Sequence, residues 1–270
     1  LMTAYLARSG GGAPDFEPLE VQFADYALWQ HRELGDRNDP SSVVARQLAY
    51  WTDALADVPD VIDLPADRPR PMAATQRGGR VTGAVPAAVG DRIRAIAAER
   101  GLTPFMVVHA ALSVLLSRLS AGDDITVATP IAGRGQRALD PLVGMFVNTL
   151  VLRARVTPDM AFAELLDQVR ESDLEAFAHA DVPFEMIVDA VSPVRSEAFA
   201  PLAQVMLTLD QSTLPEFVAA PTATGIADLT ITPVSPADPP AKLDLTVSVS
   251  VADHGADWPI EAVFARDLFD

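Results

Sequence analysis

The segment Val143-Gly-Met-Phe-Val-Asn-Thr-Leu-Val-Leu-Arg153 says more about the fold than any other stretch of this chain. It is mostly apolar, and its pattern predicts a β-strand from about Val143 to Val156. One amide side chain, Asn148, stands in its middle, and the small residues of Thr129-Pro-Ile-Ala-Gly-Arg134 precede it. An amide in so apolar a run must find hydrogen-bond partners or face a cavity. Asn148 is therefore a candidate site residue.

Helical and strand patterns are mixed along the rest of the chain. Apolar spacing and end residues predict helices over 21–34, 42–55, 87–100, 162–178 and 183–191, and a further, buried helix that Thr103 caps and Pro104 opens. Short apolar runs predict strands over 80–85, 124–128, 201–209, 229–234, 243–251 and 259–265, which complete one sheet with residues 143–156. Strands mixed with long helices indicate an α/β sandwich, with a mixed sheet flanked by helices.

Bulk composition excludes several classes of function. The 270 residues carry a formal net charge of −17, which disfavours binding to nucleic acid and to anionic membranes. The chain has no cysteine, so disulfides, thiolate nucleophiles and cysteine-based metal sites are excluded, and a cytoplasmic location is expected. No apolar run is long enough to cross a bilayer. The glycine-rich stretch 9–14 reads as a linker, and the residues before it resemble the end of a helix cut from something longer.

No group of residues forms a complete catalytic apparatus. The four histidines, His31, His109, His179 and His254, show no HExxH pattern, and His109 is expected to be a satisfied core or rim residue. The run His179-Ala-Asp-Val-Pro-Phe-Glu185 could hold a metal, but a turn in which Asp181 caps the next helix is favoured. The sequence contains no G-x-S-x-G elbow and no phosphate-binding loop. No metal site is therefore expected.

Several motifs, in order, resemble the condensation domains of nonribosomal peptide synthetases. The matching segments are Val21-Gln-Phe-Ala-Asp-Tyr-Ala-Leu-Trp-Gln30, Leu64-Pro-Ala-Asp-Arg-Pro-Arg-Pro71, Gly122-Asp-Asp-Ile, Thr129-Pro-Ile-Ala-Gly-Arg134, the opening segment Val143–Arg153, His179–Glu185 and Pro201-Leu-Ala-Gln-Val-Met. Each is weak alone, but seven in order form a specific pattern. The resemblance implies a fold like that of chloramphenicol acetyltransferase.

The family's catalytic motif, H-H-x-x-x-D-G, is absent from this sequence. In the family it lies just upstream of where this chain begins. The resemblance therefore implies that residues 1–20 end an N-terminal lobe and its linker, and that residues 21–270 form the C-terminal lobe. The parent domain would be an amide-forming acyltransferase of antibiotic biosynthesis and secondary metabolism, and this fragment alone is expected to be inactive.

The same resemblance implies substrates and partners. No cofactor is expected to be bound, because the acyl and aminoacyl groups arrive as thioesters on the phosphopantetheine of carrier proteins. Expected partners are the N-terminal lobe, donor and acceptor carrier proteins, and a neighbouring adenylation domain.

The expected substrate tunnel and lobe interface involve Thr129, Pro130, Ala132, Arg134, Asn148 and Gln204. Arg134 would pair with the motif aspartate of the other lobe. For Asn148 and Gln204, a structural role stays equally open. A latch onto the other lobe is expected within Ser235–Lys242. Two alternatives stay open, namely a non-catalytic module that docks carrier proteins or other partners, and a relative that performs epimerisation or heterocyclisation.

Overall fold

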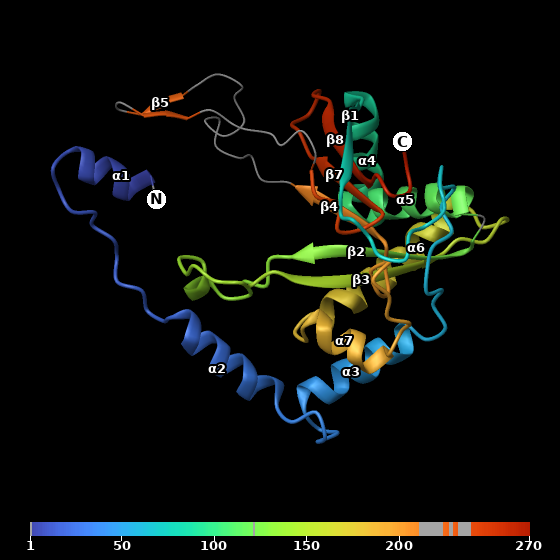
Figure 1. Cartoon of the computed structure of the whole chain (residues 1–270), viewed down its shortest axis with the longest axis horizontal. Coiled ribbons are helices and arrows are strands. Elements are labelled where there is room, and N and C mark those ends of the chain that lie inside the picture. The colour runs from blue at the N-terminus through green and yellow to red at the C-terminus, as the bar shows by residue number, and fades with distance from the viewer. Residues whose placement is uncertain (1, 121, 211–223, 227–228, 232–238) are drawn as a thin grey trace.

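The computed structural model describes residues 2–120, 122–210, 224–226, 229–231 and 239–270 (Figure 1). Its helices are α1 Met2–Ser9, α2 Phe23–Leu34, α3 Val43–Ala54, α4 Ala87–Arg100, α5 Pro104–Ser120, α6 Phe162–Ala178 and α7 Phe184–Val191, with a 3₁₀ turn at Arg137–Leu139. Its strands are β1 Gly78–Val85, β2 Asp124–Ile131, β3 Asn148–Arg155, β4 Val205–Asp210, β5 Thr224–Ile226, β6 Leu229–Ile231, β7 Leu245–Ser250 and β8 Trp258–Ala265.

Six of these strands form one mixed sheet in the order β1-β8-β7-β4-β2-β3. Strand β4 runs parallel to both β2 and β7, whereas the other neighbours are antiparallel. A parallel neighbour requires a long crossover, and α6 and α7 lie in the connection between β3 and β4. The mixed α/β architecture expected from the sequence is confirmed.

Local sequence explains where several helices begin and end. The Ser42 hydroxyl accepts a hydrogen bond from the backbone of Ala45 and caps α3. Thr103 does the same for Met106 at the start of α5, and Pro104 is the first helical residue, as predicted. Helix α4 ends at Gly101 in the left-handed conformation, also as predicted.

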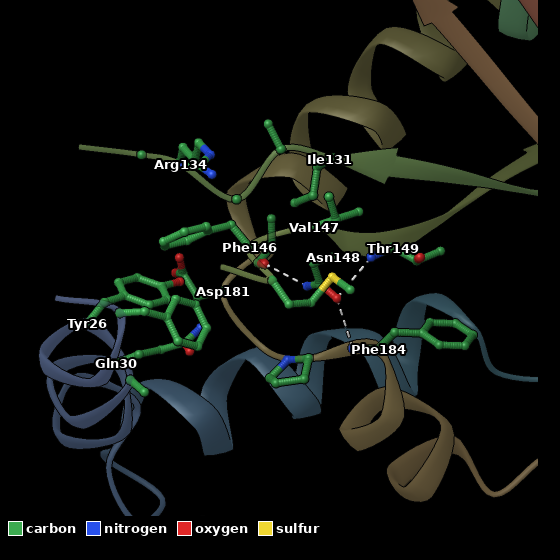
Figure 2. A pocket seen from close by; sticks show the side chains of 18 of the residues that line it. Tyr26, Gln30, Ile131, Arg134, Phe146, Val147, Asn148, Thr149, Asp181 and Phe184 are labelled. Carbon is green, nitrogen blue, oxygen red and sulfur yellow. Dashed lines mark hydrogen bonds between the residues drawn. The ribbon is translucent and has the colours of Figure 1, made fainter. Parts of the chain in front are cut away.

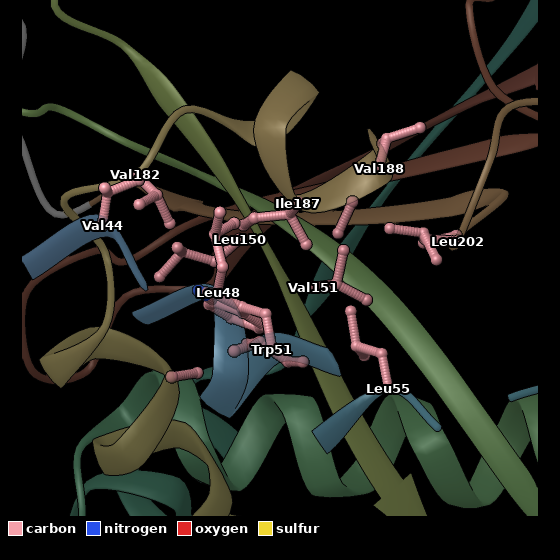
Figure 3. Packing of buried hydrophobic residues seen from close by; sticks show 14 residues of the cluster. Val44, Leu48, Trp51, Leu55, Leu150, Val151, Val182, Ile187, Val188 and Leu202 are labelled. Atoms are coloured by element: carbon pink, nitrogen blue, oxygen red, sulfur yellow. The ribbon is translucent and has the colours of Figure 1, made fainter. Parts of the chain in front are cut away.

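The largest buried cluster joins α3, α7 and the middle of β3 (Figure 3). Trp51 of α3 and Leu150 of β3 are fully buried in it, and Ile187 packs there from α7. The Trp51 indole donates a hydrogen bond of 2.8 Å to the carbonyl oxygen of His179, which satisfies its one polar atom. This packing fixes the turn between α6 and α7 against the strand that carries Asn148.

Three predicted elements differ in the structure. Strand β3 begins at Asn148 instead of Val143, because residues 143–147 form a loop that is exposed except for Phe146, with Val143 95% and Met145 78% exposed. Strand β4 begins at Val205, because Leu202 adopts a positive φ that breaks the extended run. The predicted strand 229–234 does not join the main sheet; its described part is β6, which pairs with β5.

Helix α7 begins at Phe184, with Pro183 as its N-cap, so the prediction that Asp181 caps this helix is wrong. The Asp181 side chain instead accepts a hydrogen bond of 2.6 Å from Gln47 of α3.

Within the described residues, no single helix has both the length and the apolar composition needed to cross a membrane. Helices α4 and α5 meet that test only as a pair, with a bend of 110° between them.

Candidate functional site

An open cleft of about 620 Å³ lies where α2, the β2–β3 connection and the α6–α7 turn meet (Figure 2). Helix α2 contributes Tyr26 and Gln30 to its wall, and the β2–β3 connection contributes Arg134 and Phe146. The α6–α7 turn supplies the carboxylate of Asp181, and the start of α7 supplies that of Glu185. The cleft therefore draws on segments up to about 160 residues apart in the sequence, since Phe23 and Glu185 both line it.

Asn148 lies in this cleft, but its amide is fully engaged with the protein backbone. Its nitrogen donates to the carbonyl oxygens of Ala180 at 3.1 Å and Val182 at 2.8 Å. Its oxygen accepts from the backbone of Thr149 at 2.9 Å and Phe184 at 3.0 Å, as the dashed lines in Figure 2 show in part. All the ordinary hydrogen-bonding capacity of an amide is used. Of the two roles left open, the geometry favours the structural one, which joins β3 to the α6–α7 turn.

A second amide, Gln47 of α3, holds the same turn from the other side. It is buried, donates to the Asp181 carboxylate, and accepts from the backbone of Asp181 at 3.1 Å and Val182 at 3.2 Å. This residue was not among those predicted from the sequence. The available indication was its position among Val44, Leu48 and Trp51, which places a polar side chain on the buried face of a helix.

Arg134 lies at the rim of the cleft and is half-buried. Its guanidinium donates to the carbonyl oxygens of Leu139, Asp140 and Leu142, the last at 2.9 Å. Its carbon atom Cζ lies 4.2 Å from the centre of the Phe146 ring. These bonds use Nη1 and Nη2, so Nε and part of the guanidinium edge have no acceptor within the described part of the chain. Arg134 thus supports its own loop and still offers a cationic edge.

Two glycines allow close backbone contacts in the β2–β3 connection. Gly133 has φ +64°, and its α-carbon approaches the Phe146 carbonyl so closely that a side chain would overlap it. Gly144 lies directly against the Phe23 ring of α2, where even a methyl group would overlap the ring. The loop can therefore pack on both itself and α2.

Electrostatics at the cleft are mixed. Partial burial, and then the nearby Asp181 carboxylate, raise the pKa of the Tyr26 phenol above its ordinary value. Tyr26 therefore stays neutral at physiological pH, in a cleft that is also lined by the cationic Arg134 and by the carboxylates of Asp181 and Glu185.

The run Thr129–Arg134 also borders a second hollow of about 450 Å³. Thr129, Pro130 and Ala132 line it together with Phe105 and Phe177, whose rings meet edge to face with centres 6.4 Å apart. Ala132 lines both hollows, so this run connects them.

Gln204 lies in neither hollow. Its buried amide donates to the carbonyl oxygens of Asp60 and Ala200 and accepts from the backbone of Ile62. It holds the 60–62 connector against β4, which again favours the structural role of the two left open.

None of the four histidines lines the cleft. His31 is exposed on α2, His179 stacks on the Tyr50 ring with centres 3.9 Å apart, and His254 contacts Asp91. His109 is fully buried beside Asp173, at 3.0 Å from Nδ1 to Oδ1, a partner that the sequence analysis did not identify. Its Nε2 has no partner among the described residues, so it is not the fully satisfied histidine expected. In the part of the chain that the structure covers, no group of acidic, histidine or cysteine side chains could hold a metal ion.

Half of the latch predicted within Ser235–Lys242 lies outside the described residues, which resume at residue 239. Pro239 and Ala241 exchange backbone hydrogen bonds of 2.9 Å with Gly78 and Gln76, which places this part beside the start of β1.

The similarity to known proteins extends over the whole chain. Residues 1–270 match the family model described as "Condensation domain". CymA of Salinispora arenicola (strain CNS-205), a probable non-canonical nonribosomal peptide synthetase (NRPS), is 46% identical over 275 residues. That alignment covers 100% of this chain and 4% of CymA, so the chain spans only a small part of this relative.

Solved structures also resemble this chain over its whole length. The X-domain from teicoplanin biosynthesis is 31% identical, with a TM-score of 0.86 over 100% of this chain and 60% of that one. The complex of that X-domain with OxyB matches with a TM-score of 0.85 and 31% identity, over 100% of this chain and 58% of the other. These likenesses confirm the fold class expected from the sequence.

Proposed function

Because this chain belongs to the condensation-domain family, whose model spans residues 1–270, we propose that it is the C-terminal lobe of a domain that forms amide bonds. Residues 21–270 form the lobe, and residues 1–20 complete a helix of the N-terminal lobe and the linker. Two thioesters, each held on the phosphopantetheine of a carrier protein, meet between the lobes. The acceptor amine attacks the donor carbonyl carbon, the new C–N bond forms, and the donor thiolate leaves.

The placement of charged and titratable groups carries this proposal. The rim of the cleft offers a guanidinium edge at Arg134, whereas none of the four histidines lines the cleft. An imidazole that accepts the amine proton would then come from the other lobe, and this lobe positions the reacting groups. Arg134 would contribute by pairing its open edge with a carboxylate of that lobe, an orienting role that suits a planar, permanently charged group.

The two hollows suggest which residues of this lobe form the tunnel wall and which residues support it. The run Thr129-Pro-Ile-Ala-Gly-Arg134 borders both, so Thr129 and Pro130 face one space, Arg134 faces the other, and Ala132 faces both. We assign this run to the tunnel surface, and Asn148 and Gln204 to its support.

The test is single-turnover amide formation between two loaded carrier proteins by the complete two-lobed domain. Arg134→Gln should lower the rate at least tenfold, because the charged guanidinium edge is lost. Arg137→Gln is the control, since Arg137 lies in the same loop, is exposed, and borders neither hollow. Equal rates for the wild type and Arg134→Gln would contradict the proposed role.

A second function is favoured by the similarity to the X-domain, which was solved in complex with OxyB. In this second function, the two lobes together would bind another protein and would form no amide bond. Titration of labelled carrier proteins and of candidate partner enzymes separates the two functions. Tight binding together with no amide formation by the complete domain would favour docking.

A further inference from the structure

Helix α2 is attached to the lobe mainly through aromatic side chains. None of its twelve residues is buried, and of these residues only Leu34, at its end, packs against the main core. Phe23 and Tyr26 instead pack on a small separate cluster formed by Leu139, Leu142 and Phe146 of the β2–β3 connection. The helix and this loop therefore form one packed unit beside the sheet (Figure 1).

Phe146 is the centre of that unit. It is only 5% exposed, and its ring lies 5.1 Å from the Phe23 ring at 88° and 4.8 Å from the Tyr26 ring at 51°. Arg134 covers it at 4.2 Å. The ring therefore contacts α2 aromatic side chains and the guanidinium, as Figure 2 shows for the labelled Tyr26, Phe146 and Arg134.

The remaining contacts of Arg134 come from the same loop. Leu139, Asp140 and Leu142 supply its three carbonyl acceptors, and two of these residues belong to the cluster that packs on α2. The plane of the guanidinium is thus set by one aromatic face and one row of carbonyl oxygens, which together fix the direction of its open edge.

We propose that Phe146, held by Phe23 and Tyr26 of α2, is a positioning residue that fixes the orientation of the Arg134 guanidinium. This inference rests on the proposed role of Arg134 in amide formation. It adds that the placement of α2 controls that role, because a displacement of α2 would move the ring beneath the guanidinium.

The experiment is a double-mutant cycle in the complete two-lobed domain, read as single-turnover amide formation. Phe146→Leu should lower the rate constant about tenfold with little change in the carrier concentration that gives half-maximal rate, since orientation and not binding is lost. Phe146→Tyr keeps the aromatic face and should stay within about twofold of the wild type. In the Arg134→Gln background, Phe146→Leu should have no further effect on the rate constant.

Two further variants keep the result interpretable. Phe199→Leu removes another ring near an arginine, Arg70 at 5.9 Å, and should leave the rate unchanged. Tyr26 of α2 is half-buried and contacts the Phe146 ring, so Tyr26→Leu should weaken the support of that ring. We expect a smaller loss of rate than for Phe146→Leu, and this variant keeps the proposal testable even if Phe146→Leu does not fold.

The outcomes separate this inference from the proposed function. If Arg134→Gln is inactive but Phe146→Leu and Tyr26→Leu are both fully active, the positioning role is wrong and the proposed function stands. If the Phe146→Leu effect is equally large with and without Arg134, the ring acts only on stability or packing, and the inference is again overturned. If Arg134→Gln is fully active, the proposed role of Arg134 is itself wrong.

Discussion

Asn148 and Gln47 show how single amide side chains hold this fold together. Both direct their polar atoms at the backbone of residues 180–184, between α6 and α7. These side chains bind two carbonyls and three amides of the turn, and such partners are needed because unpaired backbone groups away from water are costly. The sequence marked Asn148 as unusual, since it interrupts an apolar run. It could not reveal the partners, which lie more than thirty residues further along the chain.

Replacement of Asn148 by aspartate tests this role. The carboxylate would keep two acceptors but lose the donor, and it would face the carbonyl oxygens of Ala180 and Val182. The free energy of unfolding should fall by about 2–3 kcal/mol, measured by urea denaturation. Asn38, the only other asparagine, is exposed, and Asn38→Asp should change stability by less than about 0.5 kcal/mol. Similar effects of the two substitutions would contradict the account.

Tyr50 gives a pH-dependent prediction. Burial first, and then the carboxylates of Glu175 and Asp173, raise the pKa of its phenol to about 12. As the pH rises from about 10 towards 12, the unfolded chain releases this proton while the folded protein retains it, so the free energy of unfolding falls. Below that range the phenol is protonated in both the folded and the unfolded state, so the contribution of Tyr50 to the free energy of unfolding is fully present.

Tyr50→Phe should therefore make stability less dependent on pH in this alkaline interval, measured by urea denaturation at a series of pH values. The difference should reach up to about 1 kcal/mol, since Tyr50 is only half buried and solvent screens part of the effect. Few other groups titrate there, because the chain has three tyrosines and one lysine. Tyr5→Phe, on the exposed α1, is the control. Parallel profiles for the wild type and Tyr50→Phe would show that Tyr50 is not linked to folding.

At the scale of elements, the attachment of α2 is the feature least visible in the sequence. Caps and apolar spacing predicted most helices to within a residue or two, because those signals are local. The start of β3 was predicted five residues too early, since an apolar run does not distinguish a strand from an exposed loop that packs on a helix. The loop 143–147 is apolar in part because Phe146 is the contact point for α2.

Gly144→Ala tests that attachment. A methyl group there would overlap the Phe23 ring, so α2 should detach from the loop more often. Hydrogen exchange of the α2 amides should accelerate about tenfold, whereas exchange in β2 and β7 should not change. Gly135→Ala is a matched control in the same loop, because a methyl group there meets no atom within 4 Å. Unchanged exchange in α2 would show that the Phe23 contact does not hold the helix.

At the scale of the whole molecule, strand content was predictable but strand order was not. The order β1-β8-β7-β4-β2-β3 depends on long connections that bring β4 between β2 and β7, and no local pattern encodes this placement. The grouping of Tyr26, Arg134 and Asp181 around one cleft follows from that order and from the packing of α2. The motif resemblance located the run Thr129–Arg134, while the support provided by Gln47 and Phe146 became visible only in three dimensions.

The central claim is that this chain supplies a positioning wall and that proton transfer belongs to another lobe. The most direct measurement is amide formation between two loaded carrier proteins by this chain alone, and by the chain after addition of the separately produced N-terminal lobe. We expect no product from the chain alone and restored product on complementation. Amide formation by the chain alone, at a rate equal to that of the complemented pair, would contradict the account.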